Sequence, residues 1–255
     1  MTVASVLVGP PAVAVALAVW VPVMISVPIL AARGATGRVV GISVGVVAQV
    51  AVVIAVLASS WSVGAVAAAV ILVPVLGWTA EFVGSRTGIP FGHYHYTRAL
   101  QPQVHRVPIV IPLAWLMMLP PSWAVAQVLL PEAGWLPRAL VAGFAFMAWD
   151  IYLDPHLTRW GFWIWDQDGQ FEGIPLVNFL GWFVWAAAIS APVLGWLAPT
   201  PVLAGPLVVV YAVTWLLQGG GHLVFWRWPR SGVAGLVAMG LVALPALLRL
   251  VGTVR

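Results

Sequence analysis

The sequence predicts an all-α membrane protein: a polytopic bundle of about eight transmembrane helices that forms one domain over residues 1–255. Hydrophobic residues make up 62% of the chain, whereas a soluble domain has about 45–50%. Charged residues make up only 7%, too few to cover a fold in water. Eight apolar stretches also come close to the roughly 20 residues that a helix needs to cross a bilayer.

The eight predicted helices are separated by breaks rich in Arg, Pro, Gly or acidic residues. In chain order they cover 12–32, 39–58, 63–83, 107–130, 136–153, 176–197, 202–225 and 232–250. The first is interpreted as a retained helix, because no basic segment precedes it as in a signal peptide. The connections 84–106 and 154–175 are long and rich in polar and aromatic residues, which is typical of functional loops.

The basic residues predict the orientation in a cell membrane. All 11 are Arg, and eight of them fall in the odd-numbered connections. Because short cytoplasmic loops carry the excess of positive charge, we expect both termini outside and both long loops at the cytoplasmic face. The scattered Arg residues form no basic patch for nucleic acid. The absence of Lys and Cys excludes a retinal Schiff base, disulfides and thiolate chemistry.

Three of the seven acidic residues are the candidate catalytic groups. Four others are interpreted as solvated loop or turn residues: Glu132, Asp166, Asp168 and Glu172. Glu81, Asp150 and Asp154 instead lie at the predicted cytoplasmic ends of apolar helices, where an ionisable group is costly and therefore a functional candidate. Asp150 and Asp154 share a helix face, and Pro155 is expected to end that helix just beyond them.

The surroundings of Asp150 and Asp154 predict a proton donor. Mutual repulsion, apolar neighbours and the negative end of the helix dipole all favour the protonated acid, which can then act as a general acid. One alternative is that each acid pairs with an Arg of a nearby loop, such as Arg86, Arg98 or Arg159. Another is a magnesium site for a prenyl diphosphate, although a second acidic cluster is missing. A proton relay in a transporter is a further alternative.

Histidines and aromatic residues surround these acids in the sequence. The four histidines His93, His95, His156 and His222 are candidate proton shuttles. His93 and His95 also have the spacing of a metal-ligating pair, but five histidines are too few for a di-iron hydroxylase, and we expect no metal. Aromatic residues that could stabilise a cation cluster beside the acids: Trp160, Phe162, Trp163, Trp165, Phe171, Phe179, Trp182 and Trp185.

Four motifs in a fixed order resemble a known family. They are EFVGSRTGIPFGHYHY at 81–96, DIYLDP at 150–155, GFWIW at 161–165 and GIPLVNFLGW at 173–182. Over roughly residues 75–185 the chain resembles the membrane carotenoid-biosynthesis hydratase family, of the bisanhydrobacterioruberin hydratase and gamma-carotene 1'-hydratase type. The remaining helices match only by hydropathy.

The resemblance implies a hydro-lyase that adds water to the terminal C1–C2 double bond of an acyclic (psi) carotenoid end group, with no cofactor. Protonation would give a tertiary carbocation, which water then captures. The implied catalytic residues are Asp150, Asp154 and Glu81. The expected substrate-binding residues are Tyr94, Tyr96, Trp163, Trp165, Asn178 and Trp182. A carotenoid or terpene cyclase or isomerase with the same proton donor is the nearest alternative, and a membrane prenyltransferase or proton-coupled transporter is more distant.

Overall fold

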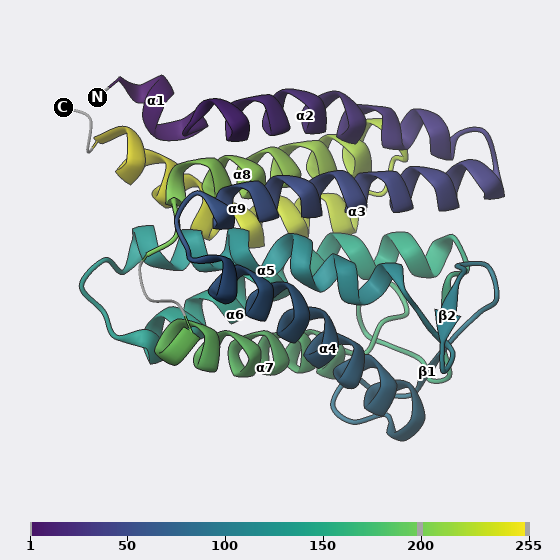
Figure 1. The fold of residues 1–255 in the computed structure, drawn as a ribbon. Coiled ribbons are helices and arrows are strands. Elements are labelled where there is room, and N and C mark those ends of the chain that lie inside the picture. The colour runs from purple at the N-terminus through teal and green to yellow at the C-terminus, as the bar shows by residue number, and fades with distance from the viewer. Residues whose placement is uncertain (1, 198–200, 253–255) are drawn as a thin grey trace.

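The computed structural model describes residues 2–197 and 201–252 and consists of long helices stacked in two layers (Figure 1). One layer contains α2, α3, α8 and α9, and the other contains α4 to α7. The helices and helical turns are α1 (Val3–Val8), α2 (Pro11–Ala31), α3 (Ala35–Ala58), α4 (Val63–Thr87), α5 (Val110–Leu129), α6 (Trp135–Arg159), α7 (Leu176–Pro192), η1 (Val193–Leu197), α8 (Ala204–Gly220), η2 (Gly221–Phe225) and α9 (Pro229–Gly252). The strands are β1 (Tyr94–Tyr96), β2 (Gln103–Val104), β3 (Val107–Pro108) and β4 (Trp163–Trp165).

The prediction of an all-α polytopic membrane bundle is confirmed. Within the described residues, eight helices are long and apolar enough to cross a membrane, and each overlaps one of the eight predicted segments. The sequence did not predict the short α1 or the four strands. Because the number of crossings is even, both termini lie at the same end of the bundle (Figure 1). That this end faces the outside of the cell stays a prediction.

The prediction that Pro155 ends its helix is wrong. Helix α6 continues through Pro155 to Arg159, so both acidic residues lie inside the helix rather than at its end. A proline inside a helix removes one backbone hydrogen bond. The residues around it, Asp154, His156 and Leu157, are all buried, and their packing offsets that loss. The loop that follows α6 is therefore shorter than predicted.

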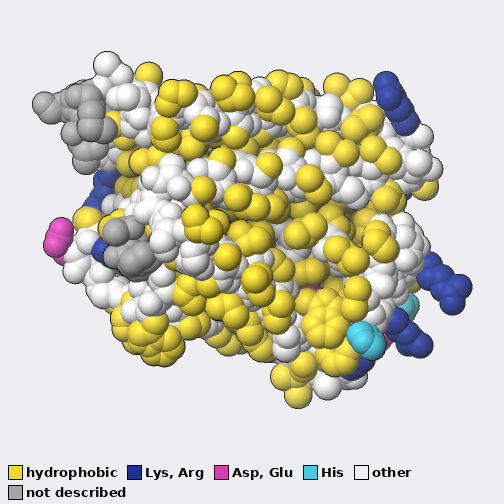
Figure 2. All heavy atoms as spheres, viewed as in Figure 1, with side chains coloured by type: hydrophobic (Ala, Val, Ile, Leu, Met, Phe, Trp, Pro, Cys, Tyr) yellow, Lys and Arg dark blue, Asp and Glu magenta, His cyan; other side chains and the backbone are white. Residues whose placement is uncertain are grey.

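The outer surface of the bundle is apolar along its length and charged at its ends. Large hydrophobic side chains such as Val63, Ile71 and Trp196 are exposed, and Figure 2 shows a broad hydrophobic flank with Arg side chains gathered mainly at one end. That end carries β1 and β4 (Figure 1). Such a surface needs lipid rather than water around it.

Glycines allow the helices to approach closely, as is common between membrane helices. A Cβ on Gly143 of α6 would lie 2.8 Å from the carbonyl oxygen of Phe183 in α7. On Gly235 of α9 it would lie 2.5 Å from the ring of Tyr152 in α6. On Gly205 of α8 it would overlap the carbonyl oxygen of Val6 in α1. These contacts fix the spacing of the pairs α6–α7, α6–α9 and α1–α8.

We expect Gly205→Ala to destabilise the bundle by about 1–3 kcal/mol, because the added methyl group collides with backbone that cannot rotate away. Gly220→Ala in the same helix is the matched control, since a Cβ there meets nothing within 4 Å. The measurement is thermal unfolding of both purified variants in the same detergent. Equal unfolding midpoints for the two variants would contradict the packing at Gly205.

Candidate active site

Glu81 lies near the end of α4 at the centre of a hydrogen-bond network made by neutral donors. Its Oε2 atom accepts hydrogen bonds from the hydroxyl groups of Tyr94 and Tyr96, at 2.6 and 2.7 Å. Its Oε1 atom accepts a longer one, 3.3 Å, from the indole of Trp115 in α5. Only 2% of the Glu81 surface is exposed. The carboxyl group is thus fixed by donors from two different segments of the chain.

The strand pair β1 and β4 explains why the tyrosines and tryptophans alternate with other residues in the sequence. In the antiparallel register, Tyr94 faces Trp165 and Tyr96 faces Trp163. Because alternate residues of a strand point to opposite faces, these four side chains share the inner face, over the acids. His95 and Ile164 lie opposite each other and are exposed on the outer face. The strand pair therefore brings together the donors for two acids.

Asp150 and Asp154 are joined by the side chain of Asn178 on α7. The Asn178 amide donates to Oδ2 of Asp150 at 2.9 Å and to Oδ2 of Asp154 at 2.7 Å. The Oδ1 atom of Asp154 also accepts hydrogen bonds from Thr158, Trp163 and Trp165, at 3.0, 2.7 and 3.1 Å. Among the described residues, Asn178 is the one hydrogen-bond partner of the Asp150 carboxyl group, whose Oδ1 atom is buried without a partner.

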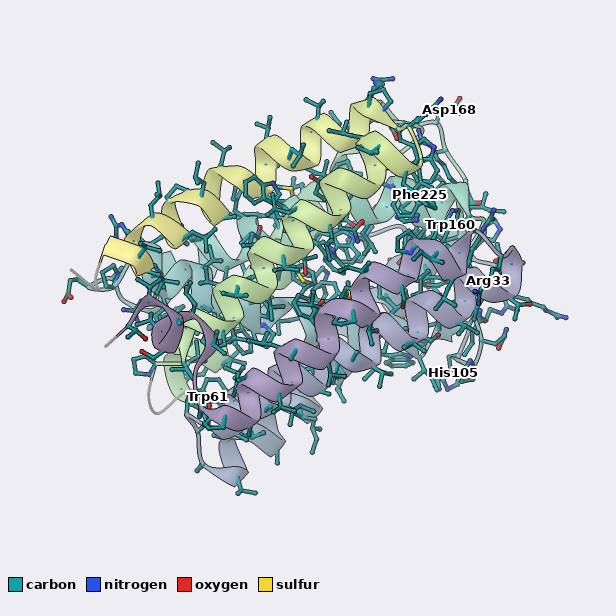
Figure 3. The ribbon with its side chains drawn as sticks, turned by 90° about the horizontal axis from the view of Figure 1, so that it is seen from above. Arg33, Trp61, His105, Trp160, Asp168 and Phe225 are labelled. Atoms are coloured by element: carbon teal, nitrogen blue, oxygen red, sulfur yellow. The ribbon has the colours of Figure 1, made fainter. Side chains whose placement is uncertain are left out.

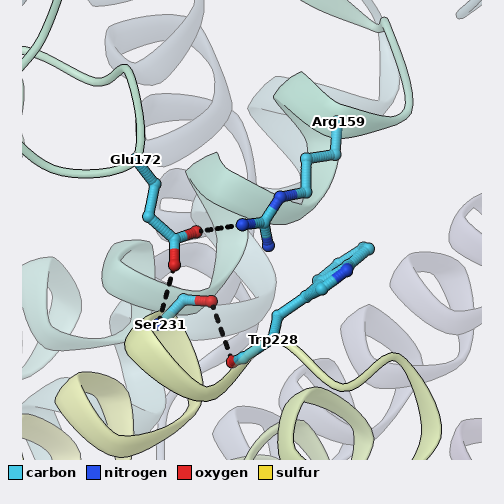
Figure 4. Close-up of polar contacts among 4 residues, drawn as sticks. All are labelled: Arg159, Glu172, Trp228 and Ser231. Atoms are coloured by element: carbon cyan, nitrogen blue, oxygen red, sulfur yellow. Dashed lines mark hydrogen bonds and ion pairs between the residues drawn. The ribbon is translucent and has the colours of Figure 1, made fainter.

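Cations do not compensate these acids. Asp150 and Asp154 are 0% and 1% exposed, and no ion pair among the described residues includes them or Glu81. Arg159, one of the alternative partners considered for the acids, pairs at 2.8 Å with Glu172 instead. Figure 4 shows this pair, together with the backbone N–H of Ser231, which donates to the same carboxylate. Glu172, expected to be a solvated turn residue, is in fact buried at its carboxylate.

A cavity of about 90 Å³ opens beside the acids. One water needs only about 10–15 Å³ on the same scale, so the cavity has room for water and for part of a larger molecule. All but one of the predicted catalytic and substrate-binding residues line it: Glu81, Tyr94, Tyr96, Asp154, Trp163, Trp165, Asn178 and Trp182. Asp150 does not line the cavity and is linked to it through Asn178, which also contacts Asp154.

Aromatic rings form one wall of this cavity. Trp182 of α7 stacks on Trp115 with ring centroids 5.0 Å apart, and on Phe146 at 5.3 Å. The aromatic residues that were predicted to form one cluster lie in separate groups. Trp163, Trp165 and Trp182 lie at the acids, whereas Phe171 pairs with Phe179 and Trp160 packs on His156.

The four candidate proton shuttles lie in two different environments. His93 and His95 are exposed, and His95 pairs with Asp166 at 2.8 Å on the outer face of the strand pair. His156 lines the cavity but is enclosed by Trp160 and Trp226, with ring centroids 3.9 and 4.1 Å away. His222 packs beside it at 5.3 Å. No three His, Asp or Glu side chains within the described ranges gather in a way that could hold a metal ion.

Sequence reasoning missed three residues that complete the site. Trp115 donates to Glu81 and Thr158 donates to Asp154, and Trp149 lines the cavity. Thr158 lies one helical turn after Asp154, a spacing that the prediction of a helix end at Pro155 obscured. The two tryptophans lie in apolar helices, where nothing in the sequence distinguishes them from ordinary core residues.

The two tyrosines outside the membrane helices are held as neutral hydrogen-bond donors. Removal of the phenols from water, followed by the charge of the adjacent Glu81 carboxylate, raises the pKa of Tyr94 and of Tyr96 well above the ordinary value. Both hydroxyl groups therefore keep their protons, and their hydrogen bonds to Glu81, well into the alkaline range.

Comparison with known proteins gives one family and one relative. The family described as "Carotenoid biosynthesis protein" matches residues 40–242. The chain is 30% identical, over 174 residues, to a bisanhydrobacterioruberin hydratase from Haloarcula japonica. That match covers 64% of this chain and 58% of the relative, so the chain spans little more than half the length of that protein. No solved structure matches.

The tyrosines predict how stability depends on pH. Unfolded phenols ionise near pH 10, whereas the folded Tyr94 and Tyr96 resist ionisation, so their contribution to stability is complete below about pH 10 and is lost as the pH rises above it. A Tyr94→Phe/Tyr96→Phe variant should lose less stability than the wild type between about pH 9 and about pH 11. Unfolding midpoints across this range test the difference. Parallel curves for the two proteins would show that these phenols titrate normally.

Proposed function

The chain belongs to the carotenoid biosynthesis protein family, and we propose that it is a hydratase that adds water to an acyclic carotenoid. The proposed reaction converts the terminal C1–C2 double bond of a psi end group into a tertiary alcohol. The observation that carries the proposal is the bridge from Asp150 through Asn178 to Asp154, at a cavity with aromatic walls. The similarity to a bisanhydrobacterioruberin hydratase also supports it.

In this proposal the aspartate pair supplies the proton. Two buried carboxylates that share one amide donor and have no cation would repel each other, and one shared proton removes that repulsion. Asp154 lines the cavity and would deliver this proton to C2 of the substrate. Asp150 would act as a positioning residue that keeps the proton on the pair. The new C–H bond at C2 leaves a tertiary carbocation at C1.

The cavity walls would stabilise that carbocation. The faces of aromatic rings attract a cation, by up to about 2 kcal/mol each when water is excluded. Trp163, Trp165 and Trp182 line the cavity beside Asp154. Because Trp163 and Trp165 donate their indole N–H groups to Asp154, the rings that face the cation are also fixed to the acid that generates it.

Glu81 would complete the reaction as the base. Its carboxyl group is held in place by three hydrogen bonds. As the carboxylate it would orient a water and take its proton as the water oxygen bonds to C1. Asp154 then has lost one proton and Glu81 has gained one. Transfer of that proton back within the cluster restores the starting state, so the net reaction adds one water.

Expression in a lycopene-producing bacterium tests this function. We expect the wild type to convert the acyclic pigment into products heavier by one or two waters, read by chromatography and mass spectrometry. Asp154→Asn and Glu81→Gln should lower the rate by about 10²–10⁴-fold, the usual contribution of a general acid or base. Asp150→Asn should have a smaller effect. Asp166→Asn, an exposed acid beside the site, is the matched control and should leave the rate unchanged.

Two results would overturn parts of this proposal. A wild-type protein that leaves all acyclic carotenoids unchanged would contradict the hydratase function, and a new pigment of unchanged mass would indicate a cyclase or isomerase. If hydration occurs but Asp154→Asn is as active as Asp166→Asn, the assignment of the proton donor is wrong and only the function stands.

A further inference from the structure

The cavity continues from the acids into the part of the bundle that lipid surrounds. Beyond the acids it is bordered by Met24 and Val27 of α2, Ile42 and Val46 of α3, and Gln218 of α8. Leu153 and Leu157 of α6 also line it. Except for His156 and Gln218, the side chains in this part are apolar. A ligand that fits here is therefore a hydrocarbon chain rather than a polar group.

Helices α2 and α8 both contribute residues to this part of the cavity. Near the chain termini they are held together through α1 and the turn before α2, where Gly205 packs on Val6 and a Cβ on Gly9 would lie 3.0 Å from Leu203 and Pro206. Toward the other end they diverge, as Figure 3 shows from above. There Trp160, which lines the cavity, is seen between Arg33 after α2 and Phe225 after α8.

The wall on the α2 side has fewer backbone hydrogen bonds than an ordinary helix. Pro22 and Pro28 both lie inside α2, and each removes one such bond. Met24 and Val27, the cavity residues of this helix, lie between the two prolines. A helix bends most readily at such positions. The cavity wall formed by α2 is therefore the one that can move.

We propose that this part of the cavity is the binding channel for the polyene chain of the substrate, and that the chain reaches it from the bilayer between α2 and α8. The inference rests on the proposed function, because it takes a long linear unsaturated hydrocarbon as the ligand. The reacting end group lies at Asp154, and the rest of the chain passes Leu153, Met24 and Val27 into lipid. A polyene enters by this route without crossing water.

The test compares substitutions that fill the channel with neighbours that face lipid. Met24→Trp and Ile42→Trp place a large ring in the channel. Ile25→Trp and Val44→Trp, at positions 49% and 44% exposed, are their matched controls on the same helices. All four are purified from a lycopene-producing host, and polyene absorbance per protein is measured. The channel variants should retain about tenfold less polyene than their controls, because the added ring occupies the space of the chain.

A second measurement covers the case in which the larger side chains disturb folding. The natural chain has no Cys, so Met24→Cys and Ile25→Cys each introduce a single thiol. A small membrane-permeant thiol reagent should label Met24→Cys about tenfold more slowly when polyene is bound, because the chain covers this position. Ile25→Cys should be labelled at the same rate with and without polyene.

The outcomes separate this inference from the function on which it rests. If Met24→Trp and Ile42→Trp retain as much polyene as their controls, or if polyene does not protect Met24→Cys, the channel is not at this place. If the wild type binds polyene and protects Met24→Cys but adds no water, the channel stands and the hydratase function fails.

Discussion

The arrangement of the end of the bundle that carries β1 and β4 depends on three buried carboxyl groups that pair with no cation among the described residues. Burying an ionisable group is costly unless it is paired or hydrogen-bonded. Here phenols, indoles, a hydroxyl and one amide supply the hydrogen bonds, and of the carboxyl oxygens of these three acids only Oδ1 of Asp150 receives none from the described residues. These donors come from five segments: the strands β1 and β4 and the helices α5, α6 and α7. Each segment is therefore held in place by the acids as much as it holds them.

Hydropathy predicted the helices well because the membrane leaves few other solutions. A chain in lipid must satisfy its backbone hydrogen bonds within each segment, so an apolar stretch of sufficient length forms a helix whatever its neighbours are. The failures occurred where packing or strand pairing, rather than hydropathy, decides the local structure. Pro155 lies in a buried turn of helix α6, and packing against the rest of the bundle keeps that turn helical. The strands β1 to β4 pair outside the membrane helices, and β1 pairs with β4, which is distant in sequence.

The acids of the candidate site were predictable from the sequence, and their partners only in part. Charge is rare enough in this chain that Glu81, Asp150 and Asp154 could be identified one by one. The pattern Tyr94-His95-Tyr96, read as a strand, would have separated the inner tyrosines from the outer His95. Trp115 could not have been found this way, because its indole reaches Glu81 only through the packing of α5 against α4. The bridging role of Asn178 between two residues of another helix likewise exists only in three dimensions.

The strand pair β1–β4 is one residue layer thick and separates the exposed surface of the protein from the buried acids. Its outer face carries His95, in an exposed pair with Asp166, and its inner face carries the phenols and indoles that contact the acids. Water is therefore close to the acid cluster in distance yet separated from it by rings whose only polar atoms already point inward. The same four side chains separate the acids from water and also set the local dielectric. Removing one ring would therefore change proton access and the dielectric together.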